Sequence, residues 1–320
     1  MCLEAWESTL ASASKDKTVK IWDTMSQTCL KSLHLHQYRV TTCKWLAPTT
    51  LVSADESGTL IHWDLEHVDH PKRLSAHQRA VTALHVVQPD CFVSGDSTGQ
   101  LVFWNGLAGA RQEHGSSITD IAHMTGASGA EDGIIVVTAA DQRLRLWTRH
   151  GAALKDFRIS FDFSRDHHWS IGRIVVGPSC VLYAGIDQFA CDTELNDHMV
   201  LRLVYDVADG FTQEQGFAAN SAGTSDSVGA ITALALAPTP DTPHLLVGCE
   251  KKYAFALHPT TLAPSTHPAE GPFDGAVNGM AWLTDGAYAA VTARGEVFVR
   301  FQPGGKDVQL PTRTIDLVTV

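Results

Sequence analysis

The chain has 320 residues, of which 44% are apolar and 25 are glycine, and its formal net charge is −11. This composition argues against a disordered protein, and no stretch approaches the roughly 18 apolar residues that a membrane-spanning helix needs. The negative charge is spread along the chain and would repel phosphate backbones, so we do not expect nucleic acid as a partner, and the lack of a long apolar stretch argues against a membrane. The first ten residues lack the basic start and apolar run of a secretory signal, which favours a cytoplasmic location, with the nucleus left open.

A Trp-Asp pair closes the alternating run SASKDKTVKIWD at 12–23, and similar endings recur after 41, 41 and 43 residues. Further alternating runs precede these endings and are separated by turn residues, a pattern that predicts antiparallel strands. The endings are Trp22-Asp23, Trp63-Asp64, Trp104-Asn105 and Trp147-Thr148, and the preceding runs are 9–14, 39–45, 50–55, 80–87, 91–96, 117–124 and 134–141.

Three weaker copies follow and bring the number of units to seven. Because no helical pattern of useful length occurs anywhere, we predict an all-β fold. The last runs of these copies are 199–206, 252–259 and 296–303, with Tyr205-Asp206, Leu257 and Phe301 at the place of the Trp.

The Trp-Asp ending, the period of about 40 residues and the several short runs in each unit resemble the WD40 repeat family. The resemblance is closest over 1–150 and implies a seven-bladed β-propeller of four-stranded antiparallel blades. A single propeller domain would then occupy 1–320.

Histidines in four successive units stand four residues before a β-branched residue that opens an inner strand. The resemblance implies that each His joins a strand Ser or Thr, a turn Asp and the Trp in a buried network, which is architecture and not a catalytic set. Ser57 and Thr98 stand at the turn position six residues before the Trp, so we expect incomplete networks in units two and three. The predicted network residues are Asp16, Trp22, His36, Trp63, His77, Trp104, His114, Asp141, Trp147 and His167.

The repeat register places the start of the first inner strand before Met1. The alternating segment TIDLVTV at 314–320 could complete that strand and close the ring, which would remove an exposed sheet edge. A truncated start of the sequence explains the same register equally well.

The fifth and sixth units carry three long segments, 163–171, 188–198 and 215–229, which the propeller topology places on one face. Aromatic and Arg side chains dominate interface energies, so this face is a candidate partner-binding patch; the alternative is that the long loops are tolerated insertions. Its candidate residues are Phe163, Arg165, His168, Trp169, Phe189, Asp192, Glu194 and Phe217.

Neither a metal site nor a cofactor is expected. His167 and His168 with Cys191 and His198 match no standard metal spacing, and no Gly-rich phosphate loop opens a helix. The seven cysteines form no CxxC pair, and most lie in alternating apolar runs, which predicts buried free thiols of a reducing compartment.

We therefore expect a non-catalytic scaffold that binds other proteins within a complex. Units one to three, with LASASKDKTVKIWD at 10–23 and HQRAVTAL at 77–84, loosely resemble actin-interacting WD-repeat proteins, so actin-filament regulation is an alternative. A subunit of a transfer-RNA-modifying complex is another. A propeller enzyme acting at the central channel is disfavoured, because the inner runs offer mostly Val, Thr, Ala, Leu and Gly.

Overall fold

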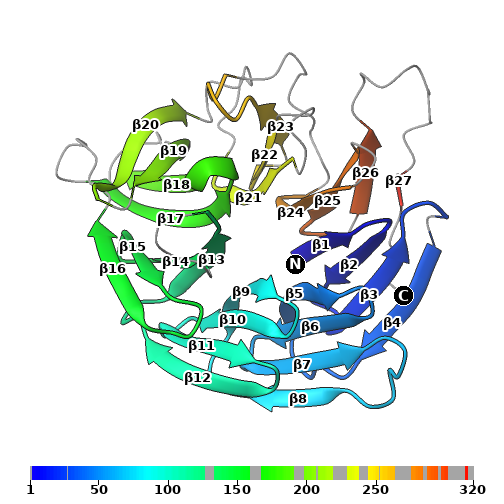
Figure 1. Cartoon of the computed structure of the whole chain (residues 1–320). Helices are drawn as coiled ribbons and strands as arrows, with labels where there is room; N and C mark the ends of the chain where they lie inside the picture. The colour runs from blue at the N-terminus through cyan, green and yellow to red at the C-terminus, as the bar shows by residue number, and fades with distance from the viewer. Residues whose placement is uncertain are drawn as a thin grey trace.

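The computed structural model of the chain places antiparallel sheets around a central axis like the blades of a propeller (Figure 1). It describes residues 2–26, 28–126, 133–158, 167–190, 198–206, 208–218, 229–237, 244–251, 253–263, 275–283, 287–294, 297–301 and 314–315. Over these ranges, no helix is long and apolar enough to cross a membrane.

The first five sheets are four-stranded meanders whose strands pair in chain order. Blade 1 contains β1 (Cys2–Trp6), β2 (Thr9–Ala13), β3 (Thr18–Asp23) and β4 (Thr28–His34). Blade 2 contains β5 (Val40–Ala47), β6 (Thr50–Asp55), β7 (Thr59–Asp64) and β8 (Lys72–Ser75). Blade 3 contains β9 (Val81–Gln88), β10 (Cys91–Asp96), β11 (Gln100–Asn105) and β12 (Ala108–Glu113). Blade 4 contains β13 (Ile118–Met124), β14 (Ile134–Ala139), β15 (Arg143–Trp147) and β16 (Ala153–Arg158). Blade 5 contains β17 (His167–Val176), β18 (Val181–Ala190), β19 (His198–Asp206) and β20 (Gly210–Ala218), with a 3₁₀ turn η1 (Pro178–Cys180) between its first two strands.

Two further sheets complete the described part of the chain. One has three strands, β21 (Ile231–Leu236), β22 (Leu245–Cys249) and β23 (Ala254–Leu257). The last blade has four, β24 (Val277–Trp282), β25 (Ala287–Thr292), β26 (Val297–Phe301) and β27 (Thr314–Ile315). The prediction of four-stranded blades is thus confirmed for six sheets, whereas the sixth unit has three strands within the described residues.

The first strand of each sheet lies nearest the axis (Figure 1). The strands β1, β5, β9, β13, β17, β21 and β24 contact one another in that order, and β24 also contacts β1, so the ring is closed.

The strand β27 pairs with β26, through Val297 with Ile315 and Phe298 with Thr314. It therefore lies at the outer edge of the last blade, and blade 1 has its own innermost strand in β1. For these two residues, the prediction that 314–320 completes blade 1 is wrong; residues 316–320 lie outside the described part.

The apolar core consists of layers between neighbouring sheets. Seven hydrophobic clusters are present in the described residues, and each is built from two sheets that are adjacent in the ring. A middle strand such as β10 is buried on both of its faces, since a neighbouring sheet covers each of them. This is why the second run of each unit carries small or apolar residues on both faces, and why its Ser and Asp residues, such as Ser94 and Asp96, are buried.

Threonines on inner strands connect one blade to the next. The Thr41 hydroxyl is 3.1 Å from the Ala54 carbonyl oxygen within blade 2 and 2.6 Å from the Val81 carbonyl oxygen in blade 3. The Thr82 hydroxyl lies in the same way between the Gly95 and Ile118 carbonyl oxygens, at 3.2 and 2.7 Å.

Candidate functional site

A buried hydrogen-bond network in blade 2 joins the Trp and His positions that the repeat predicted. Trp63 Nε1 donates to Ser53 Oγ at 2.8 Å, and the same oxygen lies 2.7 Å from His36 Nε2. His36 Nδ1 is 2.8 Å from Asp55 Oδ2. Ser53 Oγ already accepts from Trp63, and the Asp55 carboxylate can only accept. We therefore assign Ser53 O–H as the donor to His36 Nε2, and His36 Nδ1–H as the donor to Asp55. Each polar group therefore has a partner in a buried site.

Blade 3 repeats this network with the same residue types. Trp104 Nε1 donates to Ser94 Oγ at 2.9 Å, and His77 lies 2.7 Å from Ser94 and 3.0 Å from Asp96. Burial lowers the pKa of His77, although the hydrogen bond and negative charge of Asp96 oppose this effect. The neutral imidazole is the form that this chain of hydrogen bonds requires.

The aspartates of both networks lie at the ends of β6 and β10, eight residues before the Trp. Ser57 and Thr98, which occupy the predicted turn position, donate from their hydroxyls to Asp55 and Asp96, each at 2.6 Å. The prediction that blades 2 and 3 have incomplete networks is therefore wrong. Burial acts to raise the pKa of Asp55, but hydrogen bonds from His36 and Ser57 outweigh it and hold the pKa below its usual value.

Blade 1 has a shorter version of the network. Trp22 Nε1 donates to Ser12 Oγ at 2.9 Å. Asp16 does not join this pair: it accepts hydrogen bonds from the backbone N–H and the hydroxyl of Thr18, at 2.9 and 2.7 Å. Asp16 therefore stabilises the turn between β2 and β3.

Blade 4 departs most from the repeat. Val137 stands at the place of the network Ser, and Trp147 Nε1 is buried without a hydrogen-bond partner. Instead, Arg145 donates to Asp141 at 2.8 Å and lies 2.6 Å from His114 Nδ1. Burial and the Arg145 charge lower the pKa of His114 to about 4, so this His is neutral.

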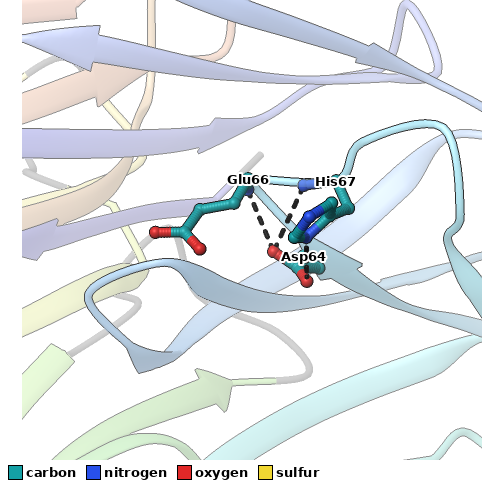
Figure 2. Close-up of side chains that lie close together, drawn as sticks. All are labelled: Asp64, Glu66 and His67. Carbon is teal, nitrogen blue, oxygen red and sulfur yellow. Dashed lines mark hydrogen bonds and ion pairs between the residues drawn. The ribbon is translucent and has the colours of Figure 1, made fainter.

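The Asp of the Trp-Asp ending caps the turn into the outer strand. Asp64 Oδ1 accepts from the backbone N–H groups of Glu66 and His67 at 2.9 and 3.3 Å, and its second oxygen lies 3.0 Å from His67 Nδ1 (Figure 2). Within the described residues this trio is the one group of three potential metal ligands, with ligand atoms within 4.8 Å of one another. Asp23 makes similar turn bonds to Met25 and Ser26, and Glu66 and His67 are exposed, so we interpret the trio as turn structure.

Most of the predicted partner-binding patch lies outside the described side chains. Phe163, Arg165, Asp192 and Glu194 are not described, and the structure gives only strand positions for His168 and Phe189, on β17 and β18. His167 and Cys191, from the network and the metal consideration, likewise have no described side chain.

The two patch residues with described side chains belong to the core. Trp169 is buried, with 9% of its surface exposed, in the cluster between blades 4 and 5. Phe217 is half-buried and packs against Phe255, with ring centroids 6.0 Å apart. The expectation that these two aromatics are exposed anchors is therefore wrong. His198, the remaining residue of the metal consideration, is buried and lies 3.0 Å from Asp187.

Charged residues lie on the innermost strands, where the sequence suggested mainly small and apolar side chains. Lys44 on β5 forms an ion pair with Glu4 on β1, and each side chain is about a quarter exposed (27% and 26%). Asp120 Oδ2 on β13 accepts the backbone N–H of Ile174 at 3.0 Å, and Arg173 donates to the Thr232 carbonyl at 3.0 Å. These contacts cross between blades and stabilise the ring.

The inner-strand histidines are part of the same region. His85 on β9 and His123 on β13 have ring centroids 6.5 Å apart. Burial and the nearby Lys44 lower the pKa of His85 to about 3, so it carries no charge near neutral pH. Lys44 and His85 follow Val40 and Val81 by four residues, a periodicity that could have revealed them in the sequence.

A groove with a volume of about 300 Å³ lies between blades 3 and 4. Arg149 and His150, in the turn between β15 and β16, form one wall, and Arg149 Nε donates to His150 Nε2 at 3.1 Å. Leu107 is 47% exposed and directly precedes a lining residue. The blade 3 lining consists of Cys91, Phe103, Trp104, Asn105, Ala108, Gly109 and Ala110.

Sequence reasoning missed this groove, because its walls are about 45 residues apart in the chain. Its lining is mainly apolar and includes the largely buried rings of Phe103 and Trp104, Arg149 adds a cation on the blade 4 wall, and the nine lining residues include neither Asp nor Glu. Such a surface can bind an apolar group next to a negative charge.

Comparison with known families agrees with the repeat architecture of the first two blades. The family model of the WD domain, G-beta repeat (WD40) matches residues 2–23 and 27–64, which cover blade 1 and the first three strands of blade 2. No curated protein matches the chain. Over the described residues the chain is thus a β-propeller with four-stranded antiparallel blades in six of its seven sheets, and its first two blades match the WD40 repeat.

Proposed function

We propose that this protein is a non-catalytic scaffold that binds other proteins, and that the groove between blades 3 and 4 is one of its binding sites. WD40 repeats generally mediate protein–protein interactions, and the closed ring provides a rigid support for binding residues. The proposal includes a single domain of seven blades, with β21–β23 as the sixth, and a cytoplasmic location.

The observation that carries the proposal is the composition of the groove. Phe103 and Trp104 line the groove with small exposed edges (4% and 6%), Leu107 beside it is 47% exposed, and Arg149 places a cation next to this apolar lining. The chain as a whole has a net charge of −11, so this combination is a local departure from an acidic surface. We infer that the occupant is a short protein segment with an apolar side chain next to a carboxylate.

Affinity purification with quantitative mass spectrometry tests this proposal. Wild-type protein is compared with Arg149→Glu, which reverses the charge of the groove wall, and with Arg79→Glu, the same change at an exposed loop between blades 2 and 3. We expect a group of proteins to be lost with Arg149→Glu and retained with Arg79→Glu. Synthetic peptides from the acidic, apolar segments of those proteins should then bind the wild type and bind Arg149→Glu at least tenfold more weakly.

Other outcomes separate the parts of the proposal. Proteins retained equally by all three forms would support a scaffold but exclude the groove. No protein enriched above an unrelated propeller would contradict the scaffold itself. If actin is among the captured proteins, filament co-sedimentation tests the narrower actin-binding alternative.

A further inference from the structure

Two cysteines from neighbouring blades meet at the inner edge of the ring. Cys2 is on β1 and Cys43 is on β5, two strands that contact each other. The Cys2 thiol donates to the Cys43 carbonyl oxygen at 3.7 Å, the Cys43 thiol donates to the Ala11 carbonyl oxygen at 3.8 Å, and the two side chains are close enough for each to shift the pKa of the other. Cys2 is half-buried, and Cys43 is fully buried. The pair therefore consists of one partly accessible sulfur, in Cys2, and one buried sulfur, in Cys43.

The surroundings of the two sulfurs differ in a way that gives them different chemistry. The hydrogen bond from Cys43 and the charge of Lys44 lower the pKa of Cys2 well below its usual value, although burial opposes them. The Thr42 hydroxyl donates to the Cys2 sulfur at 3.8 Å. The pKa of Cys43 is raised, first by its hydrogen bond to Cys2 and then by burial. Cys2 is thus the sulfur from which a thiolate forms more readily, and Cys43 is the one that keeps its proton more strongly.

We propose that Cys2 and Cys43 are a peroxide-sensitive pair that forms a reversible disulfide between β1 and β5. In the first step the Cys2 thiolate attacks one peroxide oxygen, the O–O bond breaks, and water leaves after taking up a proton. Cys2 is then a sulfenic acid. In the second step the Cys43 sulfur attacks the Cys2 sulfur, the S–O bond breaks, and the released hydroxide takes the Cys43 proton to form water. Overall, two thiols and one hydrogen peroxide give one disulfide and two waters, and a dithiol reductant reverses the change.

The disulfide would act on the ring as a whole. The strand β1 lies between β5 and β24, so it belongs to both interfaces of blade 1. The two cysteines are 41 residues apart, and a cross-link over that distance restricts the unfolded chain. We expect oxidation to raise the midpoint of thermal unfolding by roughly 5–10 °C.

Alkylation of the wild-type protein tests the reactivity of Cys2. Cys29 is exposed and Cys2 is half-buried, so accessibility alone predicts that Cys29 reacts first. With limiting iodoacetamide at pH 7 and peptide mass spectrometry, we expect Cys2 to be labelled at least fivefold faster than Cys29. Slower labelling of Cys2 than of Cys29 would overturn the proposal.

Peroxide treatment tests the disulfide. Non-reducing peptide mapping after treatment with hydrogen peroxide should yield a linked Cys2–Cys43 peptide in the wild type and in Cys29→Ser. The variant Cys43→Ser should stop at the sulfenic acid, which dimedone traps on Cys2. Because Cys43 is buried and its replacement could unfold the protein, the wild-type peptide map decides: absence of the linked peptide, or linkage of Cys2 to another cysteine, contradicts the pairing. None of these readouts depends on a partner protein, so they are independent of the proposed scaffold function.

Discussion

Ser53 and Ser94 each bind two side chains at once, because their hydroxyls accept from a Trp and donate to a His. Ser12 in blade 1 accepts only from Trp22 among the network residues. The hydroxyl oxygen of Ser53 or Ser94 thus serves two buried side chains, whereas that of Ser12 serves one.

We expect Ser94→Ala to lower the free energy of unfolding by about 1–3 kcal/mol, since it leaves both Trp104 Nε1 and His77 Nε2 without a partner. Ser12→Ala removes one partner from one Trp and should cost less. Chemical denaturation of both variants measures the difference. An equal loss in the two variants would show that the His does not depend on this hydroxyl.

His114 gives the protein a pH dependence of known sign. Its pKa is lowered to about 4 by burial and by the Arg145 charge, whereas an unfolded His titrates near about 6.5. Between these values the unfolded chain binds more protons, so stability falls as the pH falls from 6.5 to 4. Between pH 7 and pH 4, we expect the free energy of unfolding of His114→Gln to fall by on the order of 3 kcal/mol less than that of the wild type, as measured by denaturation at the two pH values. An identical pH dependence in the variant would contradict this role.

At the scale of the element, the turn after each Trp-Asp ending depends on one carboxylate. Asp64→Ala should lower the free energy of unfolding slightly, because the backbone N–H groups of Glu66 and His67 lose their acceptor. Asp64→Asn keeps an acceptor oxygen and should lose less than half as much. Calorimetry with Zn²⁺ provides the control: tight binding to the wild type that Asp64→Asn abolishes would identify a metal site instead of a turn.

The inner and outer strands of a blade differ in how much of their side chains is buried. The middle strand β10 is buried along almost its whole length, whereas the outer strands β4 and β12 are largely exposed. An exposed edge strand needs no apolar alternation, and this explains why the sequence did not reveal the fourth strand of any unit.

At the scale of the whole molecule, each sheet shares its apolar core with both neighbouring sheets. A substitution that weakens one interface should therefore lower the stability of the whole ring. Leu3 is buried between blade 1 and the last blade, and Leu3→Ala should lower the free energy of unfolding by about 2–4 kcal/mol. We expect the midpoints of circular dichroism and of tryptophan fluorescence to fall together. A shift in only one of the two signals would mean that the blades unfold separately.

The sequence determined the period, the positions of the inner three strands and the Trp and His positions of the repeat. These features are local, because a run of alternating apolar residues and a turn are set by neighbours in the chain. It did not determine which position of the hairpin supplies the network carboxylate. In blade 2 this is Asp55 at the end of β6, and not the turn position that Ser57 occupies, because the hairpin points the Asp55 side chain toward His36.

The tertiary structure alone decided which residues meet across blades. Trp169 reads as an exposed loop aromatic, but it packs into the layer between blades 4 and 5. Lys44 and Glu4, Cys2 and Cys43, and the two walls of the groove are each about 40 residues or more apart in the chain. A repeat pattern fixes what one blade contains, but contacts between blades arise only when the ring closes and brings the same face of each sheet against the next.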